Sequence, residues 1–123
     1  LIINIDDNYK NYEKILEPIL KNNKIDGVLA TDESSAIAAM KVAQKQGHNI
    51  PQDFSVISFS NGILARHSSP RMTTVSQHGE IMGETAAGIL IDRLEDKSTE
   101  KKKQETIVVR TDLVERNSTK KIL

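Results

Sequence analysis

Short apolar runs alternate along the chain with stretches in which apolar residues recur at helical spacing. The runs, which predict β-strands, are residues 1–5, 26–31, 55–59, 72–75 and 106–113. The helical spacings predict helices at 9–22, 33–46 and 77–94. Because strands and helices alternate, we expect an α/β domain built on a mostly parallel sheet with right-handed crossovers.

Proline and glycine refine this pattern. Pro18 lies inside the first predicted helix, where it lacks a backbone donor, so we expect a kink or break there. Gly47 follows the second helix and suits the left-handed position that ends many helices. About ten residues after residue 59 form a long connection, which makes that loop a candidate functional segment.

The helix at 77–94 carries an apolar surface too wide for packing on one side only. Its apolar residues are Ile81, Met82, Ala86, Ala87, Ile89, Leu90 and Leu94. Leaving several such side chains in water forfeits about 1.5–3 kcal/mol each. We therefore expect this surface to be strongly exposed or covered by another chain, and the 123 residues, which do not begin with Met, to be part of a longer protein.

Composition excludes several classes of function. The 17 basic and 17 acidic residues balance, so the chain has no polybasic surface for a phosphate backbone. Cysteine is absent, which excludes disulfides and thiolate metal sites. No apolar run is long enough for a membrane span, and residues 1–5 lack the basic start and cleavage site of a signal peptide. We expect no membrane partner.

The chain offers no support for an enzyme. It has no glycine-rich phosphate loop and no nucleophile-elbow pattern. His67, Ser68 and Ser69 are adjacent in sequence, and adjacent residues rarely adopt the geometry that a nucleophile and its base need. His48 and His78 stand apart from His67 without metal-ligand spacing. We expect no catalytic residue, no metal site and no cofactor.

Polar residues follow three of the predicted strands. In parallel sheets ligands bind beyond the carboxyl ends of the strands. This rule selects Thr31 to Glu33, Ser60 to Gly62, and the corner at Ser76 and Gln77.

From Asp26 onward an ordered set of motifs resembles the C-terminal part of LacI/GalR-type transcriptional regulators. The family's signatures are similar to residues 28–39 (VLATDESSAIAA), 47–60 (ending in PQDFSVISFS), 70–77 (PRMTTVSQ), Met82-Gly83 with Ala86-Ala87, and 113–118 (LVERNS). The match covers about three-quarters of the chain at family spacing. The sequence departs from the family at three positions: Ser60 replaces the usual Asp, a carboxylate appears instead at Asp32, and Ala38 replaces a helix Gly.

The resemblance implies a periplasmic binding protein-like type I fold, present only as its C-terminal part. Residues 1–74 would belong to the C-terminal subdomain of the effector-binding core. Residues 75–109 would supply elements of the N-terminal subdomain, and 110–123 would return to the C-terminal one. The effector would bind between the two subdomains.

The resemblance also implies site residues. Asp32 falls where the family often has an effector-contacting Asn, and Gln77 matches a Gln that faces the cleft. With Ser60 and Asn61 they form the expected effector site. A helix cap remains the alternative for Asp32, and a cap or a crossover-positioning role the alternative for Gln77. Ile37, Ile63 and Leu64 lie where the family places dimer contacts, with burial in the core as the alternative.

The function implied is that of a cytoplasmic regulator subunit. It would bind a small effector, a sugar or sugar derivative, form a homodimer, and reach operator DNA through an N-terminal helix-turn-helix that is not in this chain. A ligand would change operator affinity by binding two domain arrangements unequally. The alternative is a secreted sugar-binding protein of a transport system with the related fold.

Overall fold

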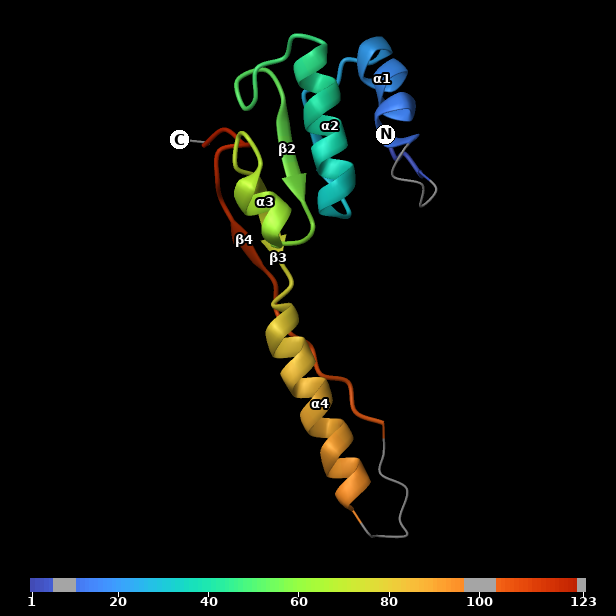
Figure 1. Ribbon diagram of the computed structural model, residues 1–123, viewed down its shortest axis with the longest axis vertical. Coiled ribbons are helices and arrows are strands. Elements are labelled where there is room, and N and C mark those ends of the chain that lie inside the picture. Colours follow the sequence, from blue (N-terminus) through green and yellow to red (C-terminus); the bar gives the residue numbers. More distant parts are fainter. Residues whose placement is uncertain (6–10, 97–103, 122–123) are drawn as a thin grey trace.

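The computed structural model describes residues 1–5, 11–96 and 104–121 (Figure 1). Its elements are α1 (Tyr12–Asn22), β1 (Gly27–Ala30), α2 (Glu33–Lys45), β2 (Ser55–Ser58), α3 (Ile63–His67), β3 (Thr73–Ser76), α4 (Gly79–Glu95) and β4 (Asp112–Val114). Strands and helices alternate along most of the chain, as predicted. The expected start of the first helix, at Tyr9, lies outside the described residues.

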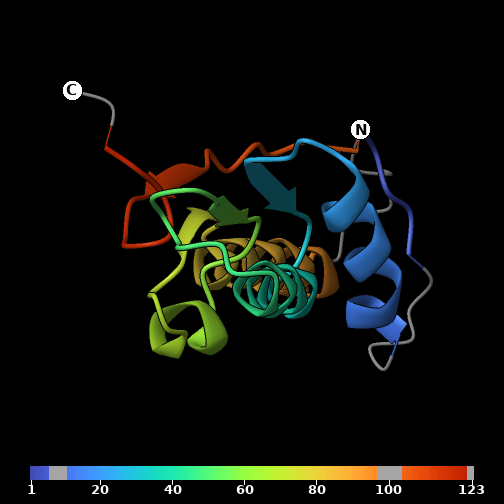
Figure 2. The ribbon, with the colours of Figure 1, turned by 90° about the horizontal axis from the view of Figure 1, so that it is seen from above.

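The four strands form one sheet in the order β1-β2-β3-β4. The first three run parallel, with Val28 opposite Val56, and β4 returns antiparallel to β3. Figure 2 shows α2 and α3 on the same face of the sheet, and α1 beside its β1 edge. The expectation of a mostly parallel α/β sheet is confirmed.

Small side chains let α2 approach the sheet closely. The residues predicted to form its buried face, Ala36, Ala39, Met40 and Ala43, are all buried. The core also contains Phe54, Val56 and Met72, and α1 adds Tyr12, Leu16 and Leu20 from one of its sides. Gly47 follows α2 with φ +88°, the left-handed conformation that its position predicts.

Of the kink or break predicted at Pro18, the break is absent, because α1 runs through this residue as one helix. Pro18 and Lys14, whose carbonyl loses its donor, are both exposed. Water can therefore satisfy that carbonyl while the opposite side of the helix keeps its packing.

Two strand predictions also differ from the structure. Residues 1–5 make no sheet pairing, although Ile3 and Ile5 pack against the core through their side chains. Of residues 106–113 only the end belongs to a strand, because the earlier part passes beside α4, where no strand accompanies it (Figure 1). The long loop after β2 contains α3, which was not predicted.

The expected exposure of the fourth helix is confirmed. No residue of α4 is buried, and Met82 is 50% exposed and Leu94 76% exposed. In Figure 1 the helix extends away from the sheet, accompanied by the returning chain.

Ser118 joins β2 to β3 near the carboxyl end of the chain. Its hydroxyl donates to the Val56 carbonyl and accepts from the Thr73 N–H at 2.8 Å, and its own carbonyl accepts from the Val56 N–H at 2.9 Å. Ser118 is fully buried. Ser58, equally buried, has a hydroxyl with no partner among the described residues.

These two serines should respond oppositely to removal of the hydroxyl. Ser118→Ala leaves a buried donor and a buried acceptor unpaired, so it should lower the free energy of unfolding by about 2 kcal/mol. Ser58→Ala removes a hydroxyl that bonds to nothing, so it should be neutral or stabilise by up to about 1 kcal/mol. Urea unfolding of the purified protein measures both. Equal destabilisation by the two variants would contradict this account.

Candidate functional site

The polar corners predicted from the sequence follow the carboxyl ends of the three parallel strands. Asp32 comes after β1, Ser60 and Asn61 come after β2, and Gln77 comes after β3. Parallel pairing sets these ends at one edge of the sheet, the edge from which α4 departs (Figure 1). The topology therefore brings the candidates to a common edge.

Asp32 is the N-cap of α2. Its Oδ1 accepts from the backbone N–H groups of Ser34 and Ser35 at 2.8 and 3.0 Å, and its Oδ2 accepts from the Ser35 hydroxyl at 2.7 Å. The cap alternative for this residue is therefore present in the structure. Among the described residues only the Ser35 hydroxyl donates to Oδ2, so this oxygen retains acceptor capacity and the cap does not occupy the whole carboxylate.

Glu33 joins the starts of two helices. Its carboxylate accepts from the Gly62 N–H and, at 3.2 Å, from the Leu64 N–H. These groups lie at the start of α3, whose orphan backbone donors need such a partner. This role was not predicted from the sequence, because Glu33 lies 29 residues from Gly62 and 31 residues from Leu64 and only the fold brings them together.

Asn61 is held by two arginines. Its side-chain Oδ1 accepts from Arg116 Nη2 at 2.5 Å and from the Thr74 hydroxyl at 3.2 Å, and its backbone carbonyl accepts from Arg66 Nη2 at 3.3 Å. Arg116 also donates to the Met72 carbonyl at 2.7 Å. The segment after β2 is thus tied to β3 through the last part of the chain.

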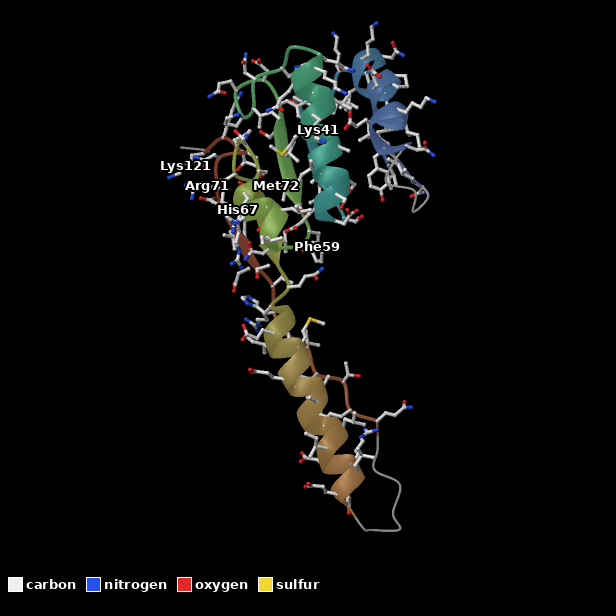
Figure 3. The ribbon with its side chains drawn as sticks, viewed as in Figure 1. Lys41, Phe59, His67, Arg71, Met72 and Lys121 are labelled. Carbon is white, nitrogen blue, oxygen red and sulfur yellow. The ribbon has the colours of Figure 1, made fainter. Side chains whose placement is uncertain are left out.

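Arg116 lies in a partly buried, positively charged neighbourhood. Burial lowers its pKa from the usual value, and the nearby guanidinium groups of Arg66 and Arg71 lower it further, whereas Glu33 raises it. Figure 3 shows Arg71 and His67 on the same side of the molecule as α3. An arginine side chain remains charged despite such shifts, so the Arg116 guanidinium only donates hydrogen bonds.

Ser60 and Gln77 are less constrained. Ser60 is half-buried and Gln77 exposed, and neither side chain bonds to another described residue. His78 follows Gln77 with φ 51° and pairs through Nε2 with Asp112 Oδ2 at 2.7 Å. This pair links the chain leaving β3 to the chain entering β4.

The three residues predicted at a subunit interface differ in exposure. Ile63 is 71% exposed and Leu64 44% exposed, both on α3. Ile37 is half-buried and packs against the core cluster. The structure therefore leaves an apolar surface on α3.

Two cavities flank α1. One, of about 470 Å³, is lined mainly by residues of 1–5, α1 and β1, with Thr31, Asp32 and Ser35 also in its lining. The other, of about 700 Å³, is lined by residues of α1, 23–26 and the end of α2. Neither of the two cavities is lined by Ser60, Asn61 or Gln77. Among the described residues no group of acids and histidines could hold a metal ion, and no helix is long and apolar enough to cross a membrane.

Comparison with known proteins agrees with this architecture. The periplasmic binding protein-like domain family matches residues 4–119. The chain is 33% identical to the HTH-type transcriptional regulator CelR of Thermobifida fusca over 94 residues, which are 76% of this chain and 27% of that protein. It is 31% identical to the HTH-type transcriptional repressor PurR of Salmonella enteritidis PT4, covering 95% of this chain and 36% of the relative. The chain thus spans about a third of the length of these relatives.

Solved structures show the same relation. A structure of the transcriptional regulator CelR–cellobiose complex superposes with a TM-score of 0.79 at 30% identity, over 92% of this chain and 34% of that one. The transcription regulator CcpA of Lactococcus lactis matches with a TM-score of 0.77 at 22% identity, over 96% and 45% of the two chains, which shows a shared fold.

The contact between Glu33 and Gly62 yields a double-mutant test. A Cβ at position 62 would lie 2.8 Å from both carboxylate oxygens of Glu33, so Gly62→Ala must displace that side chain. Gly62→Ala and Glu33→Ala should each lower the free energy of unfolding by about 1–2 kcal/mol, because both leave the N-terminus of α3 without its acceptor. Since they remove the same interaction, the double variant should lose little more than either single one in chemical unfolding. Fully additive losses would show that the two residues act separately.

Proposed function

Because the chain belongs to the periplasmic binding protein-like domain family, in the form that LacI-type transcriptional regulators carry, we propose that it is the effector-binding and dimerisation portion of such a regulator. One observation carries this proposal most: polar residues follow the carboxyl ends of three parallel strands, at the end of the sheet from which helix α4 departs. Such an edge is where open α/β sheets bind ligands.

The proposed effector is a small, sugar-like molecule. Its contacts would come from Asp32, Ser60, Asn61 and Gln77, which together supply carboxylate, hydroxyl and amide groups for hydroxyl recognition. The similarity to a solved structure of a CelR–cellobiose complex supports a sugar as the first ligand to test. The relatives compared are transcriptional regulators, so no observation favours the alternative of a secreted transport component or that of an enzyme.

The proposed domain arrangement follows from α4. Residues 1–74 would form part of the C-terminal subdomain, 75–109 would enter the N-terminal subdomain, and 110–123 would return. The exposed apolar side chains of α4 support this, because burying each against an N-terminal subdomain would contribute about 1.5–3 kcal/mol. A cleft between the two parts would then close on the effector.

The proposed regulation is a shift between two arrangements of these subdomains. The effector would favour one of them, and operator DNA would be bound in the cytoplasm by a helix-turn-helix outside these 123 residues. The coupling between effector and operator requires unequal affinity of the effector for the two arrangements. Whether the effector strengthens or weakens operator binding is set by which arrangement it prefers.

The first test separates ligand contact from capping at Asp32. In the full-length regulator, Asp32→Ala and Asp32→Ser should both weaken binding of cellobiose by at least several-fold in calorimetry, because each removes a charged hydrogen bond worth about 1.5–3 kcal/mol. Serine is also a good N-cap, so only Asp32→Ala should lower the free energy of unfolding, by about 1 kcal/mol. Operator affinity without ligand should stay near that of the wild type.

The outcome that contradicts the effector role is specific. Suppose that the wild type binds cellobiose. If both variants then bind it with the same affinity, Asp32 serves only as a cap. If the wild type binds no sugar from a panel of mono- and disaccharides, the sugar-sensing proposal itself is wrong.

The second test concerns the proposed homodimer, in which α2 and α3 would pair with their copies about a two-fold axis. Ile63→Asp should dissociate the dimer, since it places a charge where an apolar side chain would be buried. Ile15→Asp on α1, where Ile15 is 36% exposed, is the control and should leave the dimer intact. Sedimentation equilibrium of the full-length regulator measures both. A dimer equally stable in both variants would place the interface elsewhere.

A further inference from the structure

The orientation of the Asn61 carboxamide is determined by its neighbours. Its Oδ1 faces Arg116 Nη2 at 2.5 Å and the Thr74 hydroxyl at 3.2 Å. A guanidinium group only donates hydrogen bonds, so the amide atom that faces it must be the oxygen and not the nitrogen. The Nδ2 group, with its two donor hydrogens, is therefore turned away from Arg116, and no described residue accepts from it.

Arg116 is itself held in place from several directions. Nη1 donates to the Met72 carbonyl at 2.7 Å and to the Thr74 hydroxyl at 3.1 Å, and its backbone N–H donates to the Thr73 hydroxyl at 2.9 Å. These acceptors all belong to β3 or the residue before it. Because the donors of a guanidinium lie in one rigid plane, its orientation follows from β3 and fixes the atom presented to Asn61.

We propose that Arg116 is a positioning residue for the effector site: it turns Asn61 so that the corner after β2 presents hydrogen-bond donors. This proposal deepens the proposed function and rests on it. At the same edge, Asp32 retains acceptor capacity on Oδ2. Donor and acceptor together suit a ligand with several hydroxyl groups, because each hydroxyl both accepts and donates.

Asn61→Asp tests the accepting oxygen and the donating nitrogen of the amide separately. A carboxylate still accepts from Arg116, and now forms an ion pair, but it has no hydrogens to donate. In the full-length regulator, the melting temperature of this variant should equal or exceed that of the wild type, while its binding of cellobiose should be about fivefold weaker. Asn61→Ala should weaken binding to a similar degree and also lower the melting temperature. Wild-type affinity in Asn61→Asp would overturn the proposal.

A double-mutant cycle tests whether Arg116 acts through Asn61. Arg116→Lys keeps the charge and loses the planar fork, so it should weaken cellobiose binding about three- to fivefold in the wild-type background. In the Asn61→Ala background the same substitution should leave binding nearly unchanged. Equal losses in both backgrounds would show that Arg116 acts independently of Asn61 and would overturn its positioning role.

The same four proteins distinguish this proposal from the proposed function. Without ligand, the drops in melting temperature caused by Arg116→Lys and Asn61→Ala should be less than additive, because both substitutions remove the same hydrogen bond, from Arg116 Nη2 to Asn61 Oδ1. Additive drops would refute the pairing, whatever the wild type binds. A wild type that binds no sugar in the panel would refute the sugar-sensing function, and the pairing would still be decided by the melting temperatures.

Discussion

Ser118 occupies a place in the sheet where β2 and β3 do not bond to each other. The ladder between these strands begins with Ile57 opposite Thr73, and one residue earlier the backbone of Val56 bonds to Ser118 instead. A single buried hydroxyl then reaches both strands, since it donates to one and accepts from the other. The start of the parallel pairing therefore depends on one residue, Ser118, which lies 62 positions after Val56 and 45 positions after Thr73.

The C-terminal segment that contains Ser118 also contacts the candidate site. Arg116 lies two residues before Ser118 and joins β3 to Asn61. Glu33 then ties the next turn, at Gly62, to the start of α2. The corner after β2 is thus held by backbone and side-chain bonds from α2, β3 and the C-terminal segment. A binding site needs such support, because a ligand gains affinity from groups that are already in place before it binds.

The sequence predicted the layers of this fold better than the contacts of its site. Apolar spacing located α2 and four of its six buried residues, since a face that packs on a sheet leaves a strong periodic signal. Three carboxyl-end corners followed from the parallel topology alone. Pro18 misled because its effect depends on whether the freed carbonyl is solvated, and burial is not visible in a local pattern.

The roles of Glu33, Arg116 and Ser118 were missed for a different reason. Each is defined by a partner about 29 to 62 residues away, and the local sequence around a polar residue does not show which distant groups the fold will place beside it. The ending from Leu113 to Ser118 resembles a family motif, but nothing in its spacing shows that Ser118 bonds to two strands and that Arg116 bonds to the Asn61 amide.

The link between the sheet and α4 is weak by comparison. His78 and Asp112 join the two chain segments that connect them, with side chains 31% and 73% exposed. A pair so open to solvent contributes at most about 1 kcal/mol, and α4 buries no residue that would add to it. The orientation of α4 relative to the sheet is therefore not locked from the sheet side. A ligand can shift the balance between two arrangements only by its difference in affinity for them, which is commonly worth 1–3 kcal/mol. Under the proposed shift, a connection of this strength is within reach of that difference. Asn61 and Ser118 are each held by several hydrogen bonds, which both proposed arrangements would keep.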